Sequence, residues 1–160
     1  MKRIPIEYYK EAVKLLDYDP SSPSFLRWRD GRIAGTLDGG GYFIVRVLNR
    51  LMKVHRIVWY MHKGTMPDLL DHRDNNPSNN AIDNLREATE EQNRANSKKH
   101  SDNTSGVKGI SWDKKTQSWI AKCCQNYKQH HVGRFTELDD AKEALIAYRN
   151  NLHKEFARHD

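Results

Sequence analysis

The stretch from Leu69 to Asn96 constrains the fold more than any other part of the chain, and it reads LLDHRDNNPSNNAIDNLREATEEQNRAN. A short apolar run ends in an Asp-His pair, and a polar loop rich in asparagine follows. A second short run starts at Leu85, and a polar helix is expected after it. Two strands around a loop, followed by one helix, form a ββα unit too small to enclose a core. The rest of the chain must therefore support it.

Four polar side chains in this stretch have the chemistry of a hydrolytic site. Asp71 offers a carboxylate, His72 an imidazole, and Asn84 and Asn93 follow at the start of the second run and on the expected helix. Phosphodiester hydrolysis needs an activated water and a cation near the developing negative charge. An imidazole titrates near neutral pH and is suited to accept the proton of that water. The simpler alternative is a loop whose asparagine side chains only cap turns.

The pattern DHRDN…NNxxxNLR…T…QN resembles the His-Asn-His (HNH) nuclease motif, in the variant found in phage homing endonucleases of the ββα-metal (His-Me finger) class. The resemblance implies that His72 is the general base and that Asn84 orients its imidazole through the side-chain carbonyl. It also implies that Asp71 and Asn93 bind a divalent metal ion. Two oxygen ligands favour Mg²⁺, with Mn²⁺ as a substitute. No small-molecule cofactor is expected.

The composition favours a soluble protein with a polyanionic partner. The formal net charge is +6 and the isoelectric point about 9.3, which suits a nucleic acid. The resemblance implies that this nucleic acid is double-stranded DNA. No apolar run is long enough for a membrane span, so no membrane association is expected. The two cysteines, Cys123 and Cys124, are adjacent and have no metal-ligand spacing. A reducing cytoplasm is therefore expected, that of a bacterial host if the chain is phage-encoded as the resemblance implies.

The N-terminal part is expected to contain a helix over residues 4–17, followed by antiparallel strands over 25–28, 42–48 and 51–54. These strands carry many basic residues, which either discourage aggregation at solvated edges or contact DNA phosphates. Both interpretations remain open. The basic residues are Arg27, Arg29, Arg32, Arg46, Arg50 and Lys53.

The segment HRIVWYMH predicts a helix over residues 55–62 that ends at Gly64. The order vHRlvW…hkG…P…DH also resembles the phage nuclease family, so the likeness extends beyond the catalytic stretch. Within it, His55 either touches substrate phosphate or is a packed, hydrogen-bonded structural residue, and the second interpretation is favoured. His62 is expected to be exposed.

Residues 96–104 are polar and lack periodicity, which predicts a linker before a second domain. Three short strands and turns at 114–117 and 125–129 follow it, and Thr136 is the expected cap of a long helix. Alternation along the middle strand predicts that Trp119 points to the core, as does Trp112. The helix face is traced by Leu138, Ala141, Leu145, Tyr148, Leu152 and Phe156.

The segments SGVKGISWDKKTQSWIAK and VGRFTELDDAKEALIAYRN resemble the DNA-binding domain of plant ethylene-response factors. In that family a three-stranded sheet enters the major groove of DNA. Several of its base-reading arginines are absent here, so the docking mode can carry over but the recognised bases cannot. The expected DNA-binding residues are Lys108, Ser111, Lys114, Lys122, His131 and Arg134, with Asp113 and Gln129 on the same open face.

We therefore expect an α+β protein with a ββα-metal nuclease domain that includes N-terminal antiparallel strands (1–99) and a small three-stranded sheet backed by one helix (100–160). The resemblance implies a homing-type DNA endonuclease. One ββα site hydrolyses one strand at a time, so a monomer should nick. The competing hypothesis is a non-catalytic DNA-binding or regulatory protein on a nuclease scaffold. A degradative toxin-type nuclease is disfavoured by the recognition domain and by the lack of a histidine-rich metal site.

Overall fold

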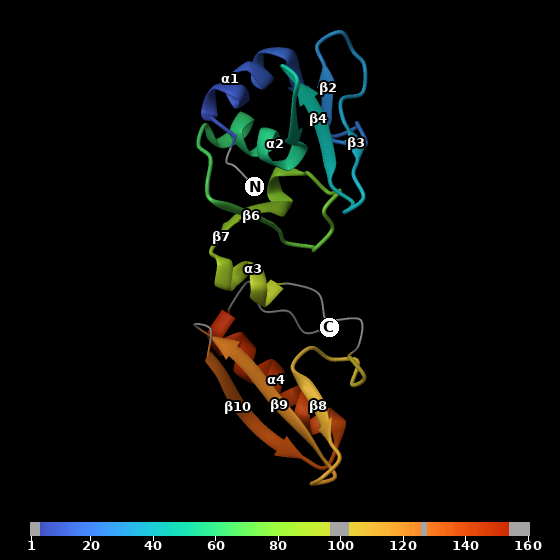
Figure 1. Cartoon of the computed structure of the whole chain (residues 1–160), viewed down its shortest axis with the longest axis vertical. Coiled ribbons are helices and arrows are strands. Elements are labelled where there is room, and N and C mark those ends of the chain that lie inside the picture. Colours follow the sequence, from blue (N-terminus) through green and yellow to red (C-terminus); the bar gives the residue numbers. More distant parts are fainter. Residues whose placement is uncertain (1–3, 97–102, 126–127, 154–160) are drawn as a thin grey trace. The chain divides into compact units, whose positions relative to one another are not determined.

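The computed structural model describes residues 4–96, 103–125 and 128–153, and it confirms the α+β class (Figure 1). The chain divides into two compact units, Met1–Glu87 and Ala88–Asp160, and each is described by itself. This division precedes the third helix, whereas the predicted domain boundary follows it. No helix in the described part of the chain is long and apolar enough to cross a membrane.

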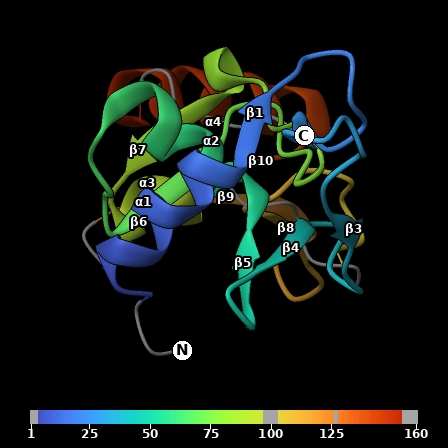
Figure 2. The ribbon, with the colours of Figure 1, turned by 90° about the horizontal axis from the view of Figure 1, so that it is seen from above.

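Two helices cover the sheets of the first unit (Figures 1 and 2). Helix α1 (Ile6–Leu15) begins after Pro5, whose fixed φ suits a helix start. Helix α2 (Val54–Lys63) ends at Gly64, which adopts the left-handed conformation with φ 68°. Glycine reaches this conformation without steric cost, so the predicted helix end is confirmed.

The first five strands, β1 to β5, form two small antiparallel sheets. Strand β1 (Leu16–Tyr18) pairs with β2 (Leu26–Trp28). Strand β4 (Phe43–Val47) lies between β3 (Thr36–Leu37) and β5 (Arg50–Lys53).

The first helix is shorter than predicted. Helical spacing continues through Leu16, but that residue is buried in β1 and pairs with Trp28. Sheet pairing and burial outweigh local helix periodicity there. Leu48 and Asn49 have positive φ values, so the turn between β4 and β5 lies one residue earlier than predicted.

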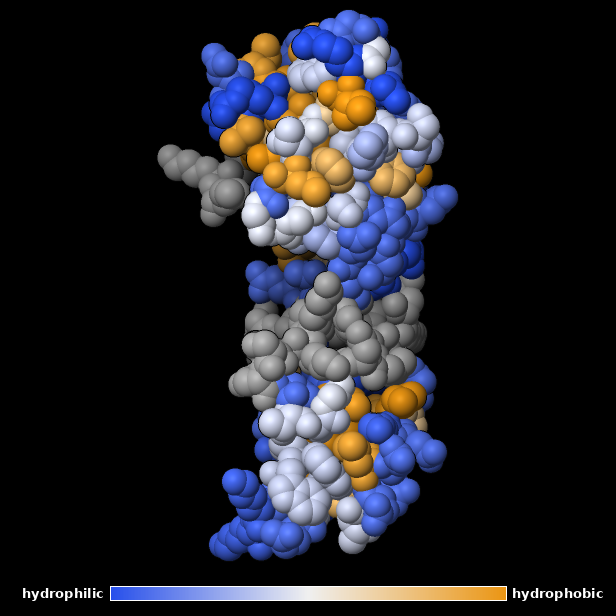
Figure 3. Space-filling model, turned by 90° about the vertical axis from the view of Figure 1, so that its right-hand side faces the viewer, coloured by the Kyte–Doolittle hydropathy of each residue, from blue (hydrophilic) through white to orange (hydrophobic). Residues whose placement is uncertain are grey.

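The core of the first unit lies between α1, α2 and the β3–β4–β5 sheet. On the face shown in Figure 3, its surface carries both hydrophilic areas and apolar patches. The fully buried larger side chains are Tyr9, Leu16, Leu26, Val47, Met52, Val54, Ile57 and Val58. This core supplies the support that the ββα stretch needs.

The predicted ββα stretch forms β6 (Leu69–His72), a single 3₁₀ turn (Ile82–Asn84), β7 (Leu85–Ala88) and α3 (Glu90–Asn96). Strands β6 and β7 pair as a two-stranded sheet. The start of α3 is a capping box. The Gln92 N–H donates to Thr89 Oγ1 (3.2 Å), and the Thr89 N–H donates to Gln92 Oε1 (2.8 Å).

The second unit contains an antiparallel sheet in the order β10–β9–β8, backed by α4. Its elements are β8 (Ile110–Asp113), β9 (Ser118–Gln125), β10 (Lys128–Phe135) and α4 (Leu138–His153). The expected sheet and helix are therefore confirmed. The core between them contains Val107, Ile110, Ala121, Cys123, Ala141 and Leu145.

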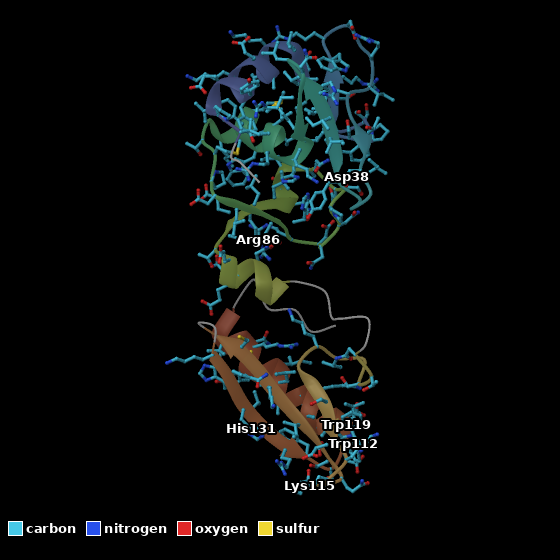
Figure 4. All side chains as sticks on the ribbon, viewed as in Figure 1. Asp38, Arg86, Trp112, Lys115, Trp119 and His131 are labelled. Atoms are coloured by element: carbon cyan, nitrogen blue, oxygen red, sulfur yellow. The ribbon has the colours of Figure 1, made fainter. Side chains whose placement is uncertain are left out.

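The prediction that Trp112 is a core residue is wrong. Trp112, near the end of β8, is 37% exposed. Its ring packs on Trp119, with the ring centroids 4.9 Å apart, and Trp119 is only partly buried (Figure 4). Most of the predicted linker, the centre of the second predicted turn and Phe156 lie outside the described residues.

Candidate active site

Asn84 fixes the conformation of the loop between β6 and β7. Its Oδ1 accepts a hydrogen bond from the Asp74 N–H (3.1 Å), and its Nδ2 donates to Asp74 Oδ1 and to the Asn79 carbonyl oxygen (2.9 Å each). Its own carbonyl oxygen accepts from the Arg73 N–H (2.9 Å). Asn84 therefore ties the residues that directly follow His72 to the start of β7.

Asp74 is the centre of the same loop. Burial raises its pKa, but hydrogen bonds from the Asn76 N–H and from the side chains of Asn79 and Asn84 outweigh that effect and hold the pKa below its usual value. The Asp74 carboxylate is therefore charged and accepts several hydrogen bonds. The asparagines around the Asp74 carboxylate have the turn-capping role that the simpler interpretation predicted. The same loop also directly follows His72.

His72 lies at the end of β6 and is only 6% exposed. Its Nε2 lies 3.4 Å from Asn80 Oδ1, which is the long end of a hydrogen bond. The side chain of Asn80 is fully buried, and its Nδ2 donates to the Ser24 carbonyl oxygen (3.2 Å). The amide nitrogen thus faces an acceptor, so its oxygen faces His72.

This orientation assigns the tautomer of His72. An amide oxygen only accepts, so the hydrogen on the neutral imidazole belongs on Nε2 and the lone pair on Nδ1. Burial lowers the pKa of His72, and Asn80, Asp74 and Asp71 oppose part of that effect. The imidazole is therefore neutral at neutral pH, the state a general base requires. The orienting contact predicted for Asn84 is made by Asn80.

Asp71 forms a buried ion pair with Arg86 of the neighbouring strand (Figure 4). Arg86 Nε and Nη2 lie 3.0 Å and 2.9 Å from the same oxygen, Asp71 Oδ2. Both residues are 6% exposed. Burial of a single charge is costly, so these two residues stay charged because each neutralises the other.

Aromatic and basic side chains from β5, from α2 and from the residue before β4 lie close to His72. The His55 ring lies edge-on to the His72 ring at 5.1 Å, and the Tyr42 ring is 5.6 Å from His55 and 6.0 Å from His72. Lys53 Nζ sits 3.9 Å from the Tyr42 ring centroid and pairs with Asp38 at 2.6 Å. The positive charge of Lys53 therefore also lies close to this cluster.

The donor set predicted for the metal fits Mg²⁺ chemically, because both candidates offer hard oxygen atoms. A carboxylate can bind two cationic groups through its two oxygens, so the ion pair with Arg86 is compatible with a metal ion at Asp71. Asn93 is exposed on α3, as predicted, and α3 belongs to the second unit. Within the described residues, no three His, Cys, Asp or Glu side chains are grouped to hold a metal.

The strand register places most predicted DNA-binding residues on one face of the second unit's sheet. Lys122 lies opposite His131, and Ile120 lies opposite both Ser111 and Arg134. Directly opposed residues share a face, and α4 packs against the other one, where Ala121 is buried.

The predicted open face is therefore present. Ser111, His131 and Arg134 are exposed, and Lys122 is half-buried. Lys114 is exposed in the turn between β8 and β9. Lys108 lies in the turn before β8, where its carbonyl oxygen accepts a hydrogen bond from Arg149. Arg134 lies 4.0 Å from Asp113, so part of its charge is neutralised.

The structure places Asp71 and His72 on β6 and Asn84 directly before β7, and it adds residues that sequence reasoning missed. Asn80 carries a weak signal, because it lies in the asparagine-rich loop of the motif. Tyr42 and Lys53 carry none, since only the tertiary fold brings their strands to the motif.

Comparison with known proteins agrees with this site. The profile of the HNH endonuclease family matches residues 52–95, which include His55, Asp71, His72, Asn84 and Asn93. Protein 3.8 of Escherichia phage T7 is 39% identical over 106 residues, which make up 65% of this chain and 87% of that protein. No solved structure gives a significant match. The chain therefore belongs to the same family as Protein 3.8, and its residues 52–95 form an HNH endonuclease domain.

Proposed function

We propose that this protein is a metal-dependent endonuclease that nicks double-stranded DNA, with His72 as the general base. The observation that carries the proposal is the hydrogen bond from His72 Nε2 to Asn80 Oδ1. It leaves the lone pair on Nδ1 to take a proton from the attacking water. A homing role follows from the resemblance alone and is part of the proposal.

Asp71 and Asn93 would hold the divalent cation, Mg²⁺ or Mn²⁺. When bound, the cation supplies positive charge at the phosphate and at the leaving oxygen. The chain's own contribution is the position of His72. Asn84 holds the loop that follows it, and Asn80 holds its ring.

Arg86 would add a positive charge on the strand next to Asp71. Its guanidinium is held by Asp71, so it needs no reorganisation when negative charge develops. The loop and the ion pair together thus preorganise both the base and the electrostatic environment.

The open face of the second unit would bind the DNA duplex. Lys122, Lys114 and Arg134 supply positive charge for phosphates, while Ser111 and His131 can contact base edges. Such a division of labour supports a monomer in which one unit cuts and the other selects the site.

A plasmid assay tests the function directly. The wild-type protein should convert supercoiled plasmid to the open-circular form with Mg²⁺ or Mn²⁺, and EDTA should stop the reaction. His72→Ala should slow nicking by roughly 10²- to 10⁴-fold with DNA affinity nearly unchanged. Asp71→Ala should act like metal removal, and sequencing of the cut ends should show 5′-phosphates.

The competing hypothesis makes the opposite prediction. A non-catalytic DNA-binding protein would bind the plasmid but leave it supercoiled at every metal and enzyme concentration. A His72→Ala variant that nicks at the wild-type rate would reject the assignment of the base.

A further inference from the structure

His55 is buried without the hydrogen bonds that a structural histidine makes. It lies on α2, is 7% exposed, and its Nδ1 is sealed from solvent with no partner. No hydrogen bond joins its ring to another residue in the described part of the chain. His55 is packed, as expected. It does not make the hydrogen bonds that were expected of a structural histidine among the described residues.

Buried polar groups nearly always have a partner. Nδ1 is sealed, so a ligand can reach this ring only at Nε2. The neighbours of His55 point to a ligand at the active site. Its ring lies 5.1 Å from that of His72 and at the same depth, since His72 is 6% exposed. A phosphate group that reaches His72 therefore comes within reach of His55.

The electrostatics at His55 suit an anion. The pKa of His55 is lowered to about 3, first by burial and then by repulsion from a protonated His72, from Arg56 and from Lys53. The ring is therefore neutral and carries one N–H donor. The same basic side chains that disfavour its protonation would attract a phosphate. A neutral donor also leaves proton transfer to His72.

We propose that His55 is a second active-site imidazole whose Nε2–H hydrogen-bonds an oxygen of the phosphate undergoing hydrolysis. Nε2 is the nitrogen that can reach the DNA, because Nδ1 is sealed. The bond would strengthen as negative charge develops on that oxygen, which makes it a contribution to the chemical step rather than to ground-state affinity. This inference rests on the proposed nuclease function.

Two other roles for His55 give different results on mutation. Trp59 lies one turn later on α2, and its Nε1 is also sealed without a partner. A water trapped beside these two nitrogens would satisfy them with no effect on the reaction. Alternatively, the ring of His55 could act only by packing against His72. Phenylalanine keeps the ring but removes the donor, and glutamine keeps an N–H donor but removes the ring.

The experiment measures single-turnover nicking of supercoiled plasmid in Mg²⁺ for wild-type protein, His55→Phe and His55→Gln. We expect His55→Phe to slow the chemical step by about 100-fold or more. Its plasmid affinity and thermal stability should not fall. His55→Gln should recover a large part of the rate.

The matched control is His62→Phe on the same helix, which should nick like wild type. His62 is exposed and its Nδ1 donates to the Val58 carbonyl oxygen (2.9 Å). Wild-type rates in His55→Phe would overturn the proposal in favour of the trapped water. A His55→Gln rate as low as that of His55→Phe, or lower, would overturn it in favour of ring packing.

A second readout separates this inference from the nuclease proposal. Imidazole nitrogens of ¹⁵N-labelled protein are followed by NMR during titration with a short DNA duplex in Ca²⁺. The His55 Nε2 signal should shift on binding, and an unchanged signal on a saturated complex would overturn the inference. Failure of wild-type protein to nick plasmid would instead reject the proposed function.

Discussion

Removal of one partner from the buried Asp71–Arg86 pair should destabilise the first unit strongly. The side chains are 7% and 6% exposed, and Arg86 donates twice to Asp71 Oδ2, at 3.0 Å and 2.9 Å. Arg86→Met keeps most of the side-chain volume but leaves a buried carboxylate without that counter-charge. Breaking such a pair costs about 3–5 kcal/mol. For a unit of this size, that lowers the melting temperature by at least about 12 °C.

The double variant Asp71→Asn/Arg86→Met should recover much of this loss, because it removes both charges. A double-mutant cycle of unfolding free energies measures the coupling between the two residues. The matched control is Arg29→Met, which breaks an ion pair to Asp17 that is 3.6 Å long with side chains 62% and 61% exposed. Exposed pairs contribute less than about 1 kcal/mol.

Calorimetry in EDTA, without DNA, is the assay, since metal binding at Asp71 would otherwise stabilise the folded state. The reasoning would be refuted if Arg86→Met lowered the melting temperature no more than Arg29→Met does. It would also be refuted if the double variant were less stable than Arg86→Met alone.

Three further predictions concern the loop, the pH dependence and the second unit. Asn84→Ala removes the three side-chain hydrogen bonds that hold the loop between β6 and β7. The rate of single-turnover nicking should therefore fall at least about 10-fold, while plasmid affinity stays within about 3-fold of the wild-type value. An unchanged nicking rate would contradict the role of the loop. The folded-state pKa of His55 is lowered to about 3, so the unfolded state binds more protons below its own pKa of about 6.5. The unfolding free energy should therefore fall as the pH drops from about 6.5 toward 3, and this residue contributes a slope of up to about 1.4 kcal/mol per pH unit. In His55→Phe, the unfolding free energy measured with urea should depend less steeply on pH by that amount between pH 4 and 6. An unchanged pH slope would show that His55 does not contribute. The double variant Lys122→Gln/Arg134→Gln should lower the slope of log binding constant against log salt concentration by about one to two. The control Lys142→Gln on α4, where the lysine is paired with Asp139, should change this slope little. Equal slopes for the double variant and wild type in a filter-binding titration would show that the open face does not contact phosphates.

The sequence alone determined the ββα unit, because its two strands and its helix depend on local patterns. The paired strands lie where the two short runs predicted them, and α3 begins at the capping residue Thr89. The same holds for the second unit, where alternation along β9 and helical spacing along α4 predict the buried faces. Trp112 shows the limit of this reasoning, since alternation assigns a side chain to a face of the sheet but does not tell how deeply it is buried.

Only the tertiary structure decided what surrounds His72. Its hydrogen-bond partner is Asn80 rather than Asn84, because the asparagine-rich loop folds around Asp74 and occupies the Asn84 side chain. Tyr42 and His55 lie far from His72 in the sequence, and the fold brings their rings to it.

The two charged residues of the site show the same division. The sequence indicates that Asp71 is chemically suited to bind a cation, but strand pairing brings it to Arg86 and burial makes that contact strong. The identity of a side chain sets what chemistry it can perform. Its protonation state, partners and depth depend on packing, and those quantities are properties of the folded chain.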